Sequence, residues 1–235
     1  MSRIRLVLIP TVASRPAPWL ILDAAGTVLE RGLLTLESPA VGPAMKTVAI
    51  VPGSDVLIRW LDLPAGTTAQ QRTAALWMLK DDLAATPDRV RLVLGPAVAG
   101  EPRLTAVVGE ALLHAWIDWL AAMELKPDAL VPDTLTVPEP FDEDVLSAVG
   151  FGPAIALRGR RFAAGIEPDL AETVAGGRRI EPVEDMRRVE QMLIAAALNP
   201  PLNLLQGAPK TGEGLGRWRL AAVLAAVALT LPLVS

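Results

Sequence analysis

Apolar and polar residues alternate through much of the first 110 positions, and this period of two predicts β-strands with one buried face. Turn-forming sequences separate the strands. Asp23-Ala24-Ala25-Gly26 forms the turn of an expected hairpin, and Pro52-Gly53-Ser54 divides two further strands. The strands expected in this half are 3–9, 19–23, 27–36, 46–51, 55–63, 89–94 and 104–108.

The period changes to that of a helix in three segments, where apolar residues recur every three to four positions. The first helix is expected from its cap, Thr68, to a stop at Thr86-Pro87. The second is expected over 110–125, and the third begins near Pro182 and stops at Asn199. Further short strands are expected at 145–149, 154–158 and 161–166. Strands that alternate with single helices indicate a mixed α/β protein with two lobes.

The last thirty residues differ from the rest of the chain. Residues 206–216 contain four glycines and one proline, a composition typical of a flexible tether. Residues 220–234 are apolar except for Thr230, and they directly follow two arginines and a tryptophan. A helix of these fifteen residues reaches about 22 Å, which is short of the ~30 Å hydrocarbon core of a bilayer.

We interpret this tail as the beginning of a membrane anchor, because it is apolar on all sides whereas a helix on a soluble domain has a polar face. The arginines lie on the side that the positive-inside rule places in the cytoplasm, where an N-terminus without a signal-peptide core also stays. The predicted organisation is a folded domain 1–206, a linker 207–216 and an anchor segment 217–235. The predicted anchor residues are Arg217, Trp218, Arg219, Leu220, Val223, Leu224, Val227 and Leu231. The alternatives are a helix packed on the folded domain and a tail that associates with another chain.

Composition excludes several classes of function. The chain has 22 basic and 26 acidic residues, a net charge of −4, which argues against a general nucleic-acid binder. It has no cysteine, so disulfides, a thiol nucleophile and cysteine metal sites are excluded. Neither a Walker lysine motif nor a G-x-G-x-x-G sequence occurs. We therefore assign no cofactor, no metal and no catalytic residue.

One turn carries residues that resemble a nucleotide-phosphate loop. In actin-like and sugar-kinase-like ATPases a strand ends in Asp-x-Gly-Thr, and the carboxylate orients hydrated magnesium. Here Asp23 precedes Gly26-Thr27 with one residue more than in that pattern, so an ordinary hairpin turn is the alternative. No second phosphate loop is found, because neither Asp128 nor Asp133 is followed by the required glycine. Gly176-Gly177 resembles the adenosine-contacting glycines but lacks their small neighbours.

The remaining polar clusters are expected to lie on the surface. His114, the single histidine, is placed on the face of its helix away from the apolar stripe. Asp81-Asp82 and the acidic segment 141–145 are interpreted as solvated charge runs. Arg158, Arg160 and Arg161 are interpreted as an exposed basic turn between two strands, and the tryptophans as mostly core residues.

Four stretches of the chain resemble the cytoplasmic part of protein L of the type II secretion system (the GspL family). They are residues 51–84, 90–95, 113–138 and 201–208. The family has a strand ending in Leu-Pro before a helix with an acidic end, and an Asn-Leu-Leu-Gln-Gly motif at the exit toward the membrane. Residues 203–207 match that exit motif. Two departures concern partner contacts: Lys80-Asp81-Asp82 replaces the usual Glu-Asp, and Arg91 stands where many members carry histidine.

The resemblance implies an actin-like ATPase or RNase H-like fold with a degenerate nucleotide site, anchored by one membrane helix. It further implies a non-enzymatic scaffold of the bacterial inner membrane, which recruits the cytoplasmic secretion ATPase (protein E) and pairs with protein M and other platform proteins. A second copy of the chain is a further candidate partner. Two alternatives stay open: an actin-like ATPase or kinase, suggested by Asp23 and Gly26-Thr27, and the cytosolic actin-like protein of type IV pilus assembly.

Overall fold

The structure is a computed structural model that describes residues 3–35, 37–38, 43–83 and 85–206. The chain divides into two compact units, residues 1–204 and 205–235. All helices and strands described below belong to the first unit, and the second is described only at Leu205 and Gln206.

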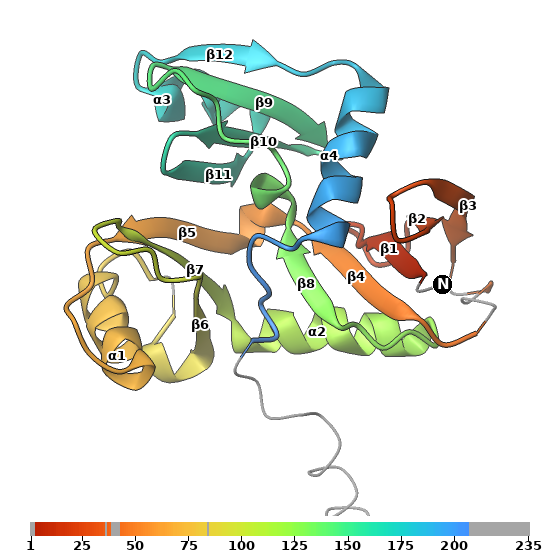
Figure 1. The fold of residues 1–235 in the computed structure, drawn as a ribbon, viewed down its shortest axis with the longest axis horizontal. Helices are drawn as coiled ribbons and strands as arrows, with labels where there is room; N and C mark the ends of the chain where they lie inside the picture. Colours follow the sequence, from red (N-terminus) through yellow and green to blue (C-terminus); the bar gives the residue numbers. More distant parts are fainter. Residues whose placement is uncertain (1–2, 36, 39–42, 84, 207–235) are drawn as a thin grey trace, which may run out of the picture. The chain divides into compact units, whose positions relative to one another are not determined.

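The largest sheet, called the β1 sheet here, has five strands in the order β3-β2-β1-β4-β8 (Figure 1). Its first three strands form an antiparallel meander, whereas β4 and β8 run parallel to β1. Strands β1 and β4 are almost entirely buried, as expected for central strands covered on both faces. The bounds are β1 Ile4–Leu8, β2 Ala17–Leu22, β3 Val28–Leu34, β4 Lys46–Val51 and β8 Ala129–Pro132.

A second sheet, the β9 sheet, repeats this arrangement with the order β11-β10-β9-β12. It is again an antiparallel meander, and its fourth strand runs parallel to its first. The bounds are β9 Val145–Phe151, β10 Ala154–Gly159, β11 Phe162–Ile166 and β12 Arg179–Pro182, with η4 Pro168–Leu170 and α3 Ala171–Ala175 before β12. One strand order therefore occurs twice, as a protein with two related lobes requires.

A third sheet, the β7 sheet, is inserted in the chain between β4 and α2, and it is antiparallel with the order β5-β7-β6. Helix α1 covers one of its faces, where Ala75 and Leu79 pack with Leu61, Leu92 and Val107. The bounds are β5 Val56–Leu61, α1 Thr68–Met78, η2 Pro87–Arg89, β6 Val90–Leu94 and β7 Arg103–Gly109.

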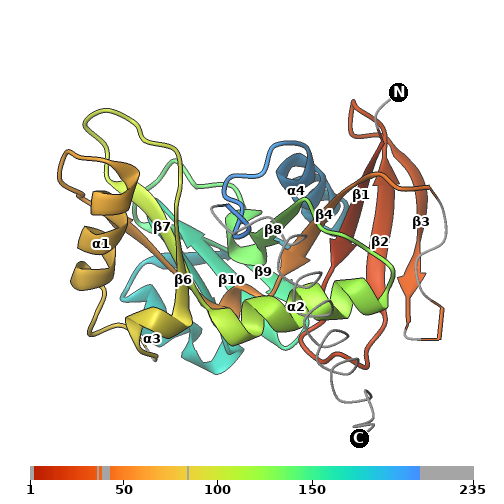
Figure 2. The ribbon, with the colours of Figure 1, turned by 90° about the horizontal axis from the view of Figure 1, so that it is seen from below.

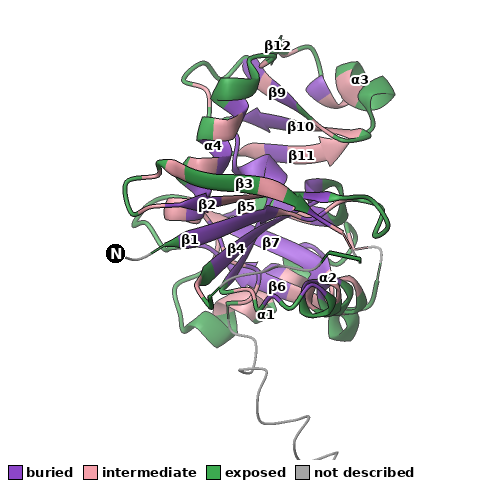
Figure 3. Ribbon diagram, turned by 90° about the vertical axis from the view of Figure 1, so that its right-hand side faces the viewer, coloured by how far each residue is buried: buried purple, intermediate pink, exposed green. Residues whose placement is uncertain are grey.

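Helices α2 (Glu110–Ala122) and α4 (Met186–Leu198) complete the packing of the β1 sheet. Seen from below, α2 lies along β4 and β8 (Figure 2). Helix α4 belongs to the core that joins the β1 and β9 sheets, and the buried residues of that region are concentrated in the strands (Figure 3). The buried residues of this core are Ile4, Leu6, Leu22, Val48, Ile50, Ala129, Val131, Val137, Val149, Ala156, Val189, Met192, Leu193 and Ala197.

All three sheets meet at a joint formed by η1 (Gly53–Asp55) and η3 (Asp133–Leu135). η1 connects β4 to β5, and η3 follows β8 on the path to β9. The Gly53 amide donates a hydrogen bond of 2.9 Å to Oδ1 of the buried Asp133. A Cβ at Gly53 would collide with that carboxylate, and one at Gly165 of β11 would collide with the backbone of Gly53 and Ser54. The joint therefore packs backbone against backbone, which requires glycine.

The mixed α/β class and most element positions agree with the sequence prediction, but several boundaries were wrong. Helix α1 is capped by Thr67, whose hydroxyl oxygen accepts from the Gln70 amide, and it ends at Met78, not near Thr86. Asp81 and Asp82, three and four positions beyond Met78, would oppose the dipole of a longer helix and favour an early end. Helix α4 begins after Asp185, and Pro182 instead ends the edge strand β12, where proline is tolerated. Three elements were missed: β8, β12 and α3.

The predicted linker 207–216 and the predicted anchor, including Arg217, Trp218, Arg219 and Leu220, lie outside the described residues. The same holds for Val223, Leu224, Val227 and Leu231. Within the described part of the chain, no helix is long and apolar enough to cross a membrane.

Removing buried volume from α4 tests its role between the two sheets. We expect Leu193→Ala to lower the free energy of unfolding by about 2–5 kcal/mol, because Leu193 is buried in the shared core. The control Gln191→Ala lies on the exposed face of the same helix and should change it by less than about 0.5 kcal/mol. Urea denaturation followed by tryptophan fluorescence measures both, and equal effects would contradict the described core.

The joint also predicts a pH dependence. Burial raises the pKa of Asp133 to about 7, against hydrogen bonds from the Gly53 and Thr134 amides, which lower it. Between pH ~4 and ~7 the unfolded chain has lost this proton while the folded protein keeps it, so stability falls as the pH rises. The side chain of Asp133→Asn cannot ionise. The free energy of unfolding of this variant, relative to that of wild type, should therefore increase by on the order of 4 kcal/mol as the pH rises from ~4 to ~7.

Asp23→Asn is the matched control, because the pKa of Asp23 is lowered in the folded protein whereas that of Asp133 is raised. The Thr27 amide, followed by other backbone amides, lowers the pKa of Asp23 in the folded protein. The stability that its carboxylate contributes is present above the unfolded pKa and is lost as the pH falls. This variant should therefore be less stable than wild type at neutral pH and equal to it in acid. A pH-independent difference for Asp133→Asn in the same denaturation series would contradict the description of the joint.

Candidate functional site

A cleft lies at the carboxyl ends of the parallel strands β1, β4 and β8. Because these strands run in one direction, the loop after β1, η1 and η3 gather at the same edge of the sheet. The β9–β10 turn reaches the same place through Phe151 and Gly152. Ligand sites of open α/β sheets usually form at this edge. The hollow has a volume of about 230 Å³, below the roughly 300–1,000 Å³ of typical small-molecule sites.

The cleft is poorly equipped to hold a phosphate. Phosphate sites are built from backbone N–H donors in glycine-rich turns and at helix amino ends. Four of the residues that line this cleft are prolines, which have no N–H: Pro10, Pro16, Pro18 and Pro52. The charged residues of the lining are Arg15 and Asp133, and the Asp133 carboxylate already accepts the hydrogen bond of Gly53. Among the described residues, no three His, Asp or Glu side chains form a cluster that could hold a metal ion.

The structure places the other predicted nucleotide residues away from the cleft. Asp23 lies in the β2–β3 turn, at the end of the sheet where β1 begins, because Ile4 pairs with Leu22. Its Oδ1 accepts the amides of Ala25 (2.9 Å) and Thr27 (2.8 Å), as in an ordinary hairpin turn. Asp128 lies at the amino end of β8, where Oδ2 accepts the Thr47 amide at 2.8 Å. Gly176 is the left-handed carboxyl cap of α3, and it does not line the cleft.

The predicted exposed turn of Arg158, Arg160 and Arg161 is only partly on the surface. Arg158 is only 8% exposed, which contradicts the expected exposed turn. Its Nη2 lies 2.7 Å from Oε2 of Glu139. Its Cζ lies over the Trp60 ring, 4.8 Å from the ring centroid, and this contact connects the β9 sheet to the β7 sheet. Burial lowers the pKa of Arg158. Arg160 and Arg161 are on the surface and pair with Glu143 and Glu101, and His114 is exposed on α2 as predicted.

The carboxyl end of α1 presents a second candidate site, here called the α1 surface and formed by Trp77, Met78, Lys80, Asp81 and Asp82. Trp77 is 69% exposed and Met78 is 49% exposed. The Lys80 ammonium lies over the Trp77 ring, 4.3 Å from its centroid. The helix is fixed beneath them by its capping box and by the buried Ala75 and Leu79. A large aromatic side chain is thus displayed on a rigid support, which is typical of protein-binding sites.

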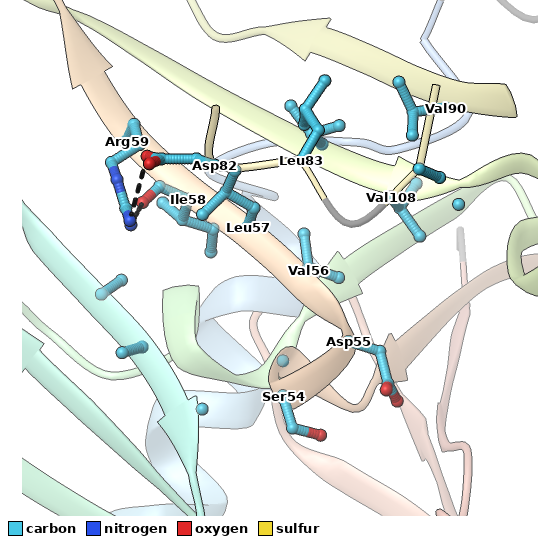
Figure 4. Close-up of a pocket in the computed structure, with 17 residues that line it drawn as sticks. Ser54, Asp55, Val56, Leu57, Ile58, Arg59, Asp82, Leu83, Val90 and Val108 are labelled. Carbon is cyan, nitrogen blue, oxygen red and sulfur yellow. Dashed lines mark hydrogen bonds and ion pairs between the residues drawn. The ribbon is translucent and has the colours of Figure 1, made fainter. Parts of the chain in front are cut away.

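A groove with a volume of about 440 Å³ begins beside the α1 surface, between β5, β7 and β11 (Figure 4). At one end, Asp82 pairs with Arg59 of β5 at 3.4 Å, and Asp55 and Ser54 of η1 lie at the other. Its walls are mainly apolar, with Leu83, Val90 and Val108 above β5. The groove therefore offers an apolar depression that begins at Asp82 of the α1 surface.

The α1 surface was missed by sequence analysis, which treated most tryptophans as core residues. A signal was present, because Trp77 stands two positions from the buried Ala75 and Leu79, off the apolar stripe of the helix. Asp81 and Asp82 were correctly placed on the surface.

Comparisons with known proteins agree with this architecture. The family model of type II secretion system protein L matches residues 7–207. Type II secretion system protein L of Dickeya chrysanthemi is 28% identical over 125 residues, which cover 51% of this chain and 31% of that protein. The matched part thus spans about a third of that curated relative.

Three solved structures are similar to this chain, and the first two have TM-scores of 0.50 or more. The cytoplasmic domain of EpsL, an inner membrane component of the type II secretion system of Vibrio cholerae, aligns with a TM-score of 0.70 and 20% identity over 88% of this chain and 99% of that domain. The PilM–PilN type IV pilus biogenesis complex aligns with a TM-score of 0.50 and 14% identity over 97% of this chain and 78% of the matched one. A Bacteroides thetaiotaomicron protein with an actin-like ATPase fold and unknown function aligns at 0.46 and 8% identity, over 86% of this chain and 93% of that one.

The family match covers most of the chain. The resemblance read from residues 51–84, 90–95, 113–138 and 201–208 is confirmed. The chain has an actin-like fold and belongs to the protein L family of the type II secretion system.

Proposed function

We propose that this chain is a non-enzymatic scaffold of the type II secretion system, which binds the cytoplasmic secretion ATPase (protein E) and holds it at the inner membrane. The exposed Trp77 on the α1 surface is the observation that carries this proposal. Burial of such a side chain by a partner removes a large apolar area from water, and tryptophan is enriched among the residues that dominate binding energy.

The chemistry of the cleft supports a scaffold over an enzyme. Its prolines provide no N–H groups for phosphate, and its carboxylate is engaged by the Gly53 amide. The actin-like body then serves as a rigid support for docking surfaces.

The location and the other partners belong to the same proposal. The similarity to a cytoplasmic domain of an inner membrane component supports a cytoplasmic body at the inner membrane. Residues 217–235 would begin the single anchor helix, with Trp218 at the interface. Protein M and the other platform proteins would be partners on the membrane side, with a second copy of this chain as a further candidate. The matched pilus structure, a PilM–PilN type IV pilus biogenesis complex, fits such a partnership.

The α1 surface gives a direct binding test. We expect Trp77→Ala to weaken binding of the amino-terminal domain of the secretion ATPase at least tenfold in a fluorescence anisotropy titration, because a central aromatic contact is worth about 2 kcal/mol or more. Leu33→Ala is the matched control, since Leu33 is 61% exposed but lies on β3 of the β1 sheet. Unchanged affinity of Trp77→Ala would remove the α1 surface from the interface, and absence of wild-type binding at micromolar concentration would reject the scaffold.

An actin-like ATPase or kinase is the competing function. We expect no change in the thermal unfolding midpoint with magnesium-ATP, because four prolines of the cleft lining provide no N–H donor for phosphate. A ligand at one hundred times its dissociation constant would add about 2.7 kcal/mol and raise the midpoint by several degrees. A clear upward change with ATP, and none with magnesium alone, would favour the enzyme.

A further inference from the structure

The side chain of Asn203 is bonded to the edge of strand β8. Its Oδ1 accepts the Leu130 amide at 3.0 Å, and its Nδ2 donates to the Asp128 carbonyl at 3.0 Å. The next residue continues the pattern, because the Leu204 amide donates to the Leu130 carbonyl at 2.9 Å. Leu202 and Leu204 are buried on either side of Asn203. The chain after α4 (blue) runs beside β8 (Figure 1).

These contacts explain how the edge of the β1 sheet is completed. β8 is the outermost strand on that side, and an edge strand presents N–H and C=O groups that need partners. One asparagine amide provides both an acceptor and a donor, as a neighbouring strand would. Residues 202–204 therefore act as a short substitute for a sixth strand.

β8 is fixed at both of its ends. At its amino end, Asp128 and Thr47 exchange two hydrogen bonds: the Asp128 amide donates to the Thr47 carbonyl, and Asp128 Oδ2 accepts the Thr47 amide, each at 2.8 Å. At its carboxyl end, Asp133 accepts the Gly53 amide in the joint of the three sheets. Two residues of a buried strand, Val131 and Pro132, thus separate the Leu130 contact from the joint.

We propose that Asn203 is a positioning residue, which fixes the point where the chain leaves the folded unit and passes a pull on the following residues into β8 and the η1–η3 joint. This role rests on the proposed scaffold function, because a pull arises when the body binds a motor and its tether is held elsewhere. Without the Asn203 side-chain bonds, the segment would be held to β8 by the Leu204 amide and the two buried leucines alone, and it would yield at a lower load. The motor's movement would then be absorbed by slack in the chain.

Hydrogen exchange on the full chain tests the contact by itself. In Asn203→Ala the Leu130 amide loses its acceptor, and we expect the peptide that contains it to exchange about tenfold faster, while β1 and β2 peptides keep the wild-type rate. Asn203→Asp retains an acceptor oxygen but loses the donor, so its effect should be smaller. Asn199→Ala is the matched control, because Asn199 is exposed at the carboxyl cap of α4. Unchanged Leu130 exchange, or equal acceleration in all three sheets, would overturn the proposal.

Pulling experiments test the transmission of force. The sequence has no cysteine, so His114→Cys and Gln206→Cys provide two unique attachment points for an optical trap. In the variant with both cysteines, adding Asn203→Ala should lower the force at which the chain first extends. Adding Asn199→Ala should leave that force unchanged. Equal first-rupture forces would overturn the role of Asn203. Neither measurement involves the ATPase, so failure of ATPase binding would reject the scaffold while leaving this result interpretable.

Discussion

The contact between the Gly53 amide and the Asp133 carboxylate is the constraint on which the arrangement of the three sheets depends. It lies where β4 and β8 end, and it joins the two short helical turns that lead to the β7 and β9 sheets. The strand β11 packs on the same turn through Gly165. Because a buried polar group needs a hydrogen-bond partner, loss of this contact would leave the Gly53 amide and Asp133 Oδ1 without one another inside the fold.

This constraint also shapes the candidate function. In an open α/β sheet the carboxyl ends of the strands are the usual place for a ligand, and here that edge carries the joint beside a cleft that contains four prolines. Prolines replace the N–H donors that phosphate would need. The exposed Trp77 lies elsewhere, on the helix α1 that covers the β7 sheet. An actin-like fold can in this way be used as a rigid body whose inserted sheet contacts a partner.

The sequence predicted those parts of the fold that depend on local periodicity. Strands such as β1, β4 and β9 and helix α2 were found because alternation and helical spacing report burial directly. Strand β8 was missed because its four residues lie among prolines and are identified by pairing with β4. Asp23 was compared with a phosphate loop because of its neighbours in sequence. The direction of the strands decides which turns lie at the same edge of a sheet, and this direction is set by long-range strand pairing. Trp77 was misjudged because its exposure depends on which helix face meets the β7 sheet. The Asn203 motif was recognised, whereas its bond to Leu130 required the fold.

We propose that this chain is a partner-binding body whose contact surface is α1 and not the cleft. Hydrogen exchange of the chain with and without the amino-terminal domain of the secretion ATPase tests it most directly. The account predicts slower exchange in residues 68–83 on complex formation and unchanged exchange in the cleft loop 9–16. Protection confined to the cleft loop, or no protection anywhere at saturating ATPase, would contradict it.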